Sequence, residues 1–154
     1  MLGIYLKMKD NMFFNSQHCT SIRQANRLLN LGLSPETADM FWLSDTYTDT
    51  VIPVCDFRNS GEKEEESSTI PSWSLGRLIE LCPRVINSGS EVAKFNLCHD
   101  GVRYECENPN LPGEFWVVKY FEESPDLFEN LISCIEWLVE EGYFKKEYLE
   151  DEIK

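Results

Sequence analysis

A long amphipathic segment near the C-terminal end constrains the fold more than any other feature of this sequence. Its apolar stripe has helical spacing and consists of Leu127, Leu131, Ile135 and Leu138, widened by Phe128, Cys134 and Trp137. Ser124 is a suitable N-cap, Pro125 fits the first helical position, and Gly142 is placed to end the helix. The sequence therefore predicts a helix over 125–141 whose stripe must be covered by other elements.

A second amphipathic helix is predicted over residues 21–31. Thr20 or Ser21 can act as N-cap, and the spacing of Ser21 and Gln24 has the form of a capping box. The apolar positions are Ile22, Ala25, Leu28 and Leu29, and the opposite, polar face is made of Arg23, Gln24, Asn26, Arg27 and Asn30. Gly32 followed by Leu33 is typical of a Schellman motif, which ends the helix.

A further helix is expected to follow this one directly, over residues 34–43. Ser34 is a good N-cap, Pro35 fits the first position, and Glu36 complements the positive end of the helix dipole. Together the two segments predict a helix–turn–helix corner over 21–43. The second helix carries Glu36 and Asp39 and no basic residue, which excludes a DNA-recognition helix.

Four segments have the composition of strands. Residues 46–57 are rich in β-branched and aromatic residues, and Pro53 favours either an edge strand or two short strand pieces there. The other three strands are predicted over 91–97, 102–107 and 114–121. Asp100-Gly101 is a hairpin signal, and the alternation of Val102, Tyr104 and Cys106 with charged residues indicates a sheet with one face in water.

The remaining segments connect these elements. Residues 59–71 are predicted to form a charged loop, and Ser72 is expected to cap a short helix that contains Leu75, Leu78, Ile79 and Leu81 and ends near Pro83. Residues 1–19 are expected to be weakly ordered or to form a short strand, and 145–154 a polar tail or one more short helix.

The element order predicts the α+β class: an antiparallel meander of three to four strands with helices packed on one face and a helical corner at the N-terminus. A length of 154 residues, of which 42% are hydrophobic and 12% aromatic, predicts a single domain over 1–154. This composition also excludes disorder of the whole chain.

The net charge of −13 is concentrated in one part of the chain. Residues 1–60 carry 6 acidic and 5 basic side chains, whereas residues 61–154 carry 21 acidic and 9 basic ones. Direct binding of nucleic acid is therefore not expected, because phosphate contacts need a local excess of Lys and Arg.

The compartment is predicted from cysteines and apolar runs. The cysteines are Cys19, Cys55, Cys82, Cys98, Cys106 and Cys134, without a CxxC pair, and Cys82 and Cys134 lie in apolar-periodic segments. An even number leaves three disulfides possible. The N-terminal residues have no secretory pattern, and no apolar run is long enough to span a membrane. We predict reduced thiols, a cytoplasmic location and no membrane contact.

Metal binding was considered at His18-Cys19 and Cys98-His99, which together hold two Cys and two His. A tetrahedral zinc site needs four such ligands, but structural zinc ligands usually come in close pairs separated by two to four residues. Neighbouring residues of a strand also point to opposite faces. The sequence therefore favours independent roles for these four residues, and we predict no metal site.

Catalytic residues are not predicted either. His18 and His99 are the only histidines, and the acidic surroundings raise rather than lower the pKa of a thiol. Carboxylate pairs occur at Glu105 and Glu107, Glu122–Glu123 and Glu140–Glu141, for which a solvated acidic face is the simpler interpretation. No phosphate-loop, dinucleotide or HExxH motif is present, so neither enzymatic activity nor a cofactor is expected.

The four tryptophans, Trp42, Trp73, Trp116 and Trp137, could line a ligand pocket or pack in the core. Each lies beside other apolar residues, which favours core packing.

Three segments carry a resemblance to known sequences: RQANRLLNLGLSPETADMFW (23–42), IPSWSLGRLIELCP (70–83) and LFENLISCIEWLVEEGYFKKEYL (127–149). In this order they resemble a group of short, uncharacterised proteins encoded by phages and integrated mobile elements of gut anaerobic bacteria. The resemblance covers about half of the chain and omits the sheet. It implies an accessory protein of a mobile element in the bacterial cytoplasm, and it implies no catalytic residue, cofactor or substrate.

Three functions remain open from the sequence. The first is a non-catalytic protein-binding or regulatory module with an unknown protein partner. The second is an acidic mimic of DNA that inhibits a nucleic-acid-binding host protein. The third is a small-molecule site lined by tryptophans.

Overall fold

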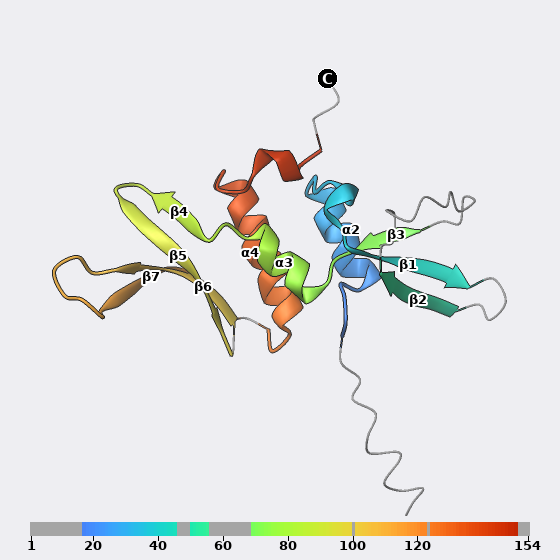
Figure 1. Cartoon of the computed structure of the whole chain (residues 1–154), viewed down its shortest axis with the longest axis horizontal. Helices are drawn as coiled ribbons and strands as arrows, with labels where there is room; N and C mark the ends of the chain where they lie inside the picture. The colour runs from blue at the N-terminus through green and yellow to red at the C-terminus, as the bar shows by residue number, and fades with distance from the viewer. Residues whose placement is uncertain (1–16, 46–49, 56–68, 100, 123, 151–154) are drawn as a thin grey trace, which may run out of the picture.

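Helices occupy the middle of the molecule, and an antiparallel sheet extends from them on either side (Figure 1). The computed structural model describes residues 17–45, 50–55, 69–99, 101–122 and 124–150. The elements are α2 (Ile22–Asn30), the 3-10 helix η1 (Pro35–Thr37), β1 (Met40–Asp45), β2 (Thr50–Cys55), β3 (Ile70–Ser72), α3 (Leu75–Leu81), β4 (Val85–Ser88), β5 (Glu91–Cys98), β6 (Gly101–Glu107), β7 (Phe115–Phe121), α4 (Leu127–Glu140) and η3 (Lys146–Tyr148). The predicted α+β class is confirmed.

The larger sheet is the predicted antiparallel meander, with strand order β4-β5-β6-β7. Its last three strands lie within one residue of the predicted ranges, and Cys98 pairs with Gly101 at the predicted hairpin. The predicted alternation is also confirmed, because Val102, Tyr104 and Cys106 are buried on the side of α4. Strand β4 was missed because its four residues include one buried apolar side chain, Ile86, which is too short a pattern to recognise.

Helix α4 lies in the centre and confirms the predicted apolar stripe. Leu131, Ile135 and Leu138 are fully buried, and Gly142 has the positive φ of 75° expected of the residue that ends the helix. The start differs from the prediction by about two residues. Asp126 is the N-cap, accepting a hydrogen bond from the backbone N–H of Phe128, whereas Ser124 lies before the helix and accepts one from the N–H of Asp126.

Helix α2 begins and ends as predicted. Ser21 is the N-cap with a complete capping box, and Gly32 has a φ of 94°. The N–H groups of Gly32 and Leu33 donate to the carbonyls of Leu29 and Leu28, which is the hydrogen-bond pattern of a Schellman motif.

The predicted second helix over 34–43 is wrong. Ser34 caps a single 3-10 turn, η1, and the backbone is already extended at Ala38. The Asp39 carboxylate accepts hydrogen bonds from the N–H and hydroxyl of Ser74, which holds the chain away from a helical path. The following residues form β1, so tertiary contacts override the local helix signal and no helix–turn–helix corner forms.

Strand β1 is the central strand of a second sheet, with order β2-β1-β3, which the sequence did not predict as a separate sheet. Strand β2 confirms the core of the predicted strand 46–57, and its edge position tolerates the exposed Pro53 opposite Trp42. Ile70 and Pro71, predicted as the end of the loop over 59–71, belong to β3, whereas residues 56–68 lie outside the described residues.

Ser72 does not cap α3 as predicted, because it is the last residue of β3 and Ser74 takes the N-cap position. The Ser72 hydroxyl is buried and donates to the carbonyl of Thr20, and the Thr20 hydroxyl accepts from the N–H of Trp73. These bonds tie the residue before α2 to the strand before α3. Within the predicted segment 1–19, residues 1–16 lie outside the described residues, and Cys19 forms an isolated β-bridge with Ser74.

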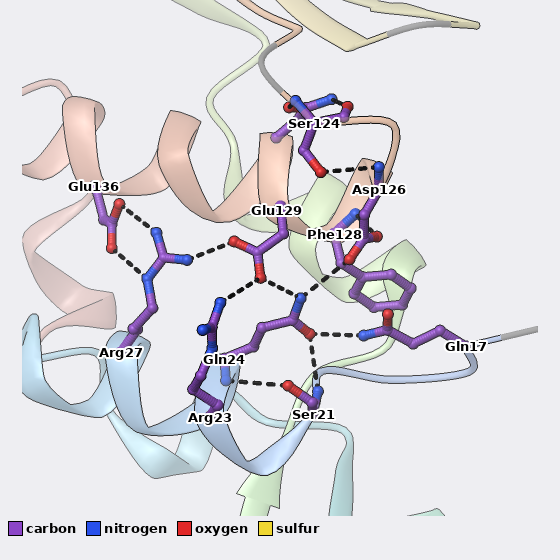
Figure 2. Close-up of polar contacts among 11 residues, drawn as sticks. Gln17, Ser21, Arg23, Gln24, Arg27, Ser124, Asp126, Phe128, Glu129 and Glu136 are labelled. Atoms are coloured by element: carbon purple, nitrogen blue, oxygen red, sulfur yellow. Dashed lines mark hydrogen bonds and ion pairs between the residues drawn. The ribbon is translucent and has the colours of Figure 1, made fainter.

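A polar network joins α2 to α4 (Figure 2). Arg27 donates two hydrogen bonds to Glu136, at 2.8 and 3.1 Å, and a third to Glu129 at 2.6 Å. Gln24 donates to Glu129 at 2.7 Å and to the N-cap Asp126 at 3.2 Å. Gln24 and Arg27 were predicted on the polar face of α2, and these two side chains reach α4 whereas Asn26 and Asn30 of the same face are exposed; Gln24 is 4% exposed.

The segment after α4 returns to the end of α2. The described part of the predicted tail, residues 145–150, contains the short helix η3, and residues 151–154 lie outside the described residues. Leu149 forms a β-bridge with Leu33, and the N–H of Glu150 donates to the carbonyl of Gly32 at 2.8 Å. In the described part of the chain, no helix combines the length and the apolar character needed to cross a membrane.

Gly101 provides the first test of the fold. Its φ is not positive, so the backbone conformation does not require glycine. Glycine is required because a Cβ there would collide with the backbone carbonyl of Phe121. We expect Gly101→Ala to lower the free energy of unfolding by about 1–3 kcal/mol in urea denaturation. Gly76→Ala in α3 is the matched control, because nothing crowds that position and alanine should stabilise the helix by about 0.5–1 kcal/mol. Equal effects of the two substitutions would contradict the close approach of β6 and β7.

Glu129 provides a test with pH. Hydrogen bonds from Gln24 and then the charge and hydrogen bond of Arg27 lower its pKa below the ordinary value of 4.5. Its stabilisation is therefore complete above that value and is lost as the pH falls through the folded-state pKa. We expect Glu129→Gln to lower the free energy of unfolding by about 1–2 kcal/mol near pH 7 and by much less near pH 3.5.

The control for this experiment is Glu80→Gln. Glu80 forms an exposed ion pair with Arg77 within α3, and its loss should change the free energy of unfolding by less than about 0.5 kcal/mol at both pH values. If the loss of stability in Glu129→Gln were the same at both pH values, its charge would not be what stabilises the contact of α2 with α4.

Candidate functional site

The exposed apolar side chains that the structure describes are concentrated on one sheet. Among the residues whose side chains are described, all seven large hydrophobic side chains that are exposed belong to the β4–β7 sheet or its loops: Val85, Val92, Leu97, Leu111, Phe115, Trp116 and Val117. The cross-strand register places Val85, Phe115 and Val117 on the face turned away from α4. An exposed apolar group of this kind usually marks an interaction surface.

The same sheet divides into two hairpins at its far end. Strands β5 and β6 pair with each other from Cys98 and Gly101 as far as Lys94 and Glu105. Beyond that point β5 continues with β4 alone, and β6 continues with β7 alone. Figure 1 shows the β4–β5 and β6–β7 hairpins diverging away from the helices. The opening between residues 90–94 and 106–109 is named the fork.

A β-bulge lies where the fork begins. The register of β6 with β7 shifts between Tyr104 and Glu105, the residue that also makes the last pair with β5. A bulge bends its strand and increases the local twist, which turns the β6–β7 hairpin away from β5. The bulge therefore explains why the sheet does not remain closed to its end.

The fork encloses a hollow of about 480 Å³. Its walls are made of Ser90, Glu91, Val92, Lys94, Cys106, Glu107, Pro109 and Trp116. This volume lies in the range of roughly 300–1,000 Å³ that is typical of ligand sites. Two carboxylates, one ammonium group and one indole give the hollow a mixed aromatic and acidic character.

One hydrogen bond spans the fork. The indole Nε1–H of Trp116 donates to Oε2 of Glu91 at 3.0 Å and so connects the two hairpins. Cys106 lies opposite Trp116 in the register and is 2% exposed. Burial, followed by the charge of Glu91, raises the pKa of the Cys106 thiol. The thiol is therefore protonated at neutral pH and is a poor nucleophile.

Charges on the outer face of the sheet differ in their partners. Glu105 forms an ion pair with Arg103 at 2.7 Å and accepts a hydrogen bond from Asn96, also at 2.7 Å. Glu107 lies on the same face, as predicted, and is exposed at the edge of the hollow. The pair predicted from sequence therefore consists of one carboxylate that is neutralised and one that faces solvent.

The four predicted zinc candidates are not brought together. His18 and His99 are exposed, Cys19 is buried beside β3, and Cys98 ends β5. Among the described residues there is no group of three or more His, Cys, Asp or Glu side chains that could hold a metal ion. Of the other carboxylates considered, Glu122, Glu140 and Glu141 are exposed, and Glu123 lies outside the described residues.

The five cysteines whose side chains the structure describes, Cys19, Cys82, Cys98, Cys106 and Cys134, are not bridged. Cys82 and Cys134 are buried in the apolar core, as their positions in periodic segments predicted. The hydrogen bond between Cys134 and Cys82, together with burial, raises the pKa of the Cys134 thiol. These two cysteines thus serve as small core residues.

The four tryptophans do not share one pocket. Trp73 is fully buried and donates to the Thr37 hydroxyl, and Trp42 donates to the carbonyl of Thr20. Trp137 packs against the rings of Tyr104, Phe121 and Tyr143. Of the four, Trp116 is the one that lines the hollow of the fork.

Comparison of the chain with models of protein families, with curated proteins and with solved structures finds no match. The interpretation of the fork therefore depends on its own geometry. Sequence reasoning missed the pairing of Glu91 with Trp116 because the two residues lie on different hairpins. The one signal in the sequence was the apolar run at the start of β7. Such a run is also typical of an ordinary half-buried strand, so it did not indicate exposure.

Thiol accessibility tests the geometry of the fork. We expect a maleimide reagent to label the half-buried Cys98 about tenfold faster or more than Cys106, because burial and the charge of Glu91 keep the Cys106 thiol protonated. Mass spectrometry of the labelled peptides separates the two sites. Trp116→Ala should accelerate labelling of Cys106 and leave Cys98 unchanged. Equal rates at both cysteines in the unaltered chain would contradict the burial of Cys106 behind Trp116.

Proposed function

We propose that this chain is a non-catalytic protein-binding module that contacts its partner with the outer face and the forked end of the β4–β7 sheet. The observation that carries the proposal is the gathering of all seven exposed large apolar side chains of the described residues on this sheet and its loops. Val85, Phe115 and Val117 are between 47% and 53% exposed. Covering the exposed half of such a side chain stabilises a complex by about 1 kcal/mol.

The position of β7 supports the same surface. It is an edge strand, paired with β6 on one side and with no strand of the described residues on the other. Natural edge strands are usually protected by charges, and β7 has Lys119 in its second half but no charged residue from Phe115 to Val118. The first half of β7 is thus an edge without protecting charges.

The negative charge of the chain supports a partner with a basic surface. The net charge of −13 favours association with a positively charged protein and opposes association of two copies. An acidic mimic of DNA would present unpaired carboxylates at regular spacing, whereas Glu129 and Glu136 are both paired with Arg27. The apolar character of the sheet favours protein binding over mimicry.

We also propose the biological setting that the sequence resemblance implies, an accessory protein of a phage or mobile element in the bacterial cytoplasm. This setting depends on the resemblance of the three segments described above.

Capture with matched bait variants tests the proposed function. A triple variant, Val85→Thr, Phe115→Thr and Val117→Thr, removes apolar contacts without touching the core. We expect a partner captured from cells that carry the element to be retained about tenfold less by this variant, because such central contacts provide most of the binding energy. Circular dichroism and urea denaturation confirm that the variant folds.

The control bait carries three substitutions of exposed polar residues elsewhere: Asn26→Thr, Glu140→Thr and Glu147→Thr. It should retain the partner like the unaltered chain. If both variants retained the partner equally, the sheet would not be the binding surface. If the captured protein were released by added duplex DNA, the interaction would be one of nucleic-acid mimicry.

A further inference from the structure

The hollow of the fork is lined by groups that suit one kind of side chain. Glu91 comes from β5 and lies on the face of Trp116 and Cys106, whereas Glu107 comes from β6 and lies at the rim of the hollow on the outer face, with Glu105. The indole of Trp116 forms part of the wall and is 36% exposed. Lys94 also lines the hollow, but it lies directly opposite Glu105 on the outer face of the sheet. The lining thus has one more negative than positive charge, beside an accessible aromatic ring.

We propose that the fork binds an arginine side chain from an extended segment of the partner protein, an inference that rests on the proposed function above. The guanidinium group stacks on the ring of Trp116 and pairs with the carboxylate of Glu91, and Glu107 adds negative charge at the rim of the hollow. Arginine suits these walls because its planar cation stacks on aromatic rings and forms paired hydrogen bonds with carboxylates.

The orientation of Trp116 is already fixed for such contacts. Its Nε1–H donates to Glu91, which holds the indole across the opening and places the carboxylate at the edge of the ring. The remaining lone pairs of Glu91 can accept from a guanidinium group. A cation bound there would contact the ring and the carboxylate at the same time. The side chains of Trp116 and Glu91 would need little rearrangement to bind it.

The backbone around the hollow fits an extended segment. Residues 91–93 of β5 and residues 106–107 of β6 face one another without forming a ladder. A hollow of about 480 Å³ is larger than one side chain, so it can also take neighbouring backbone of the bound segment. Recognition of an extended peptide by strand edges, with a pocket for one side chain, is a common mode of protein binding.

A partner protein is a better occupant than a second copy of this chain. The two carboxylates of the hollow and the net charge of −13 attract a basic segment, whereas a second copy brings the same excess of negative charge. Charge complementarity therefore selects an arginine-bearing segment of a basic partner.

The first experiment uses a short peptide and the full-length chain. The probe is the acetylated and amidated pentapeptide Gly-Val-Arg-Val-Gly, and the comparison peptide replaces arginine with citrulline, which has nearly the same shape and no charge. Binding is followed by the indole N–H signals in ¹⁵N–¹H NMR spectra, assigned with Trp116→Phe. We expect a saturable shift of the Trp116 signal with the arginine peptide and binding at least about tenfold weaker with citrulline.

Several results would overturn the proposal. They are equal binding of the two peptides, shifts confined to Trp42, Trp73 or Trp137, and the absence of any shift up to the solubility limit of the arginine peptide. A concentration-dependent shift of Trp116 without any peptide would also overturn it, because a second copy would then occupy the fork.

Charge variants provide the second experiment. Glu91→Gln keeps an oxygen that can accept from Trp116 but removes the charge, and it should weaken binding of the arginine peptide about three- to fivefold. Lys94→Met removes the opposing cation and should strengthen binding by a similar factor of about three. Glu122→Gln, which carries the same charge change at the opposite end of β7, is the control and should leave binding unchanged within about a factor of 1.5. Equal effects of Glu91→Gln and Glu122→Gln would indicate general attraction by the acidic chain and would contradict a site in the fork.

The capture experiment separates this inference from the proposed function. If the bait with Glu91→Gln retains the partner as well as the unaltered chain while the triple variant loses it, the sheet binds the partner and the arginine site is wrong. If the triple variant retains the partner, the proposed function fails independently of the fork.

Discussion

Helix α4 is the element against which the rest of the molecule is assembled. Its apolar residues Leu131, Ile135 and Leu138 are fully buried, and the helix contacts α2, α3 and the strands β6 and β7. Arg27 fixes α2 against it through Glu129 and Glu136. The two sheets therefore extend from one shared helical centre, and within the described residues no apolar layer covers the end of the β4–β7 sheet that lies far from α4.

The sequence predicted those parts of the fold whose signals are local. The caps and stop glycines of α2, the stripe of α4 and the three long strands of the meander depend on residues a few positions apart. The second sheet could not be predicted in the same way, because it depends on long-range contacts. Asp39 is held by Ser74, and β1 pairs with β3 some thirty residues later, so a good cap at Ser34 was misleading.

The candidate site was not predictable for a related reason. A hollow between two hairpins arises from a bulge at Tyr104 and from the point at which pairing of β5 with β6 ends, and neither has a sequence motif. The pairs that sequence reasoning considered for chemistry, His18-Cys19 and Cys98-His99, belong to different elements: the first precedes α2 and the second lies at the end of β5. The sequence alone does not distinguish Trp116 from the other three tryptophans. In the fold it is the one of the four that lines the hollow.

The return of the C-terminal segment to α2 has a consequence for how this chain is made. Leu149 forms a β-bridge with Leu33, and Glu150 forms a backbone hydrogen bond with Gly32. The hydrogen-bond partners of Arg27 lie more than a hundred residues later in the chain. A chain emerging from the ribosome thus cannot complete the surroundings of α2 until residue 150 has been added. Such long-range closure slows folding and makes the molecule form as one unit rather than from its N-terminal end onward.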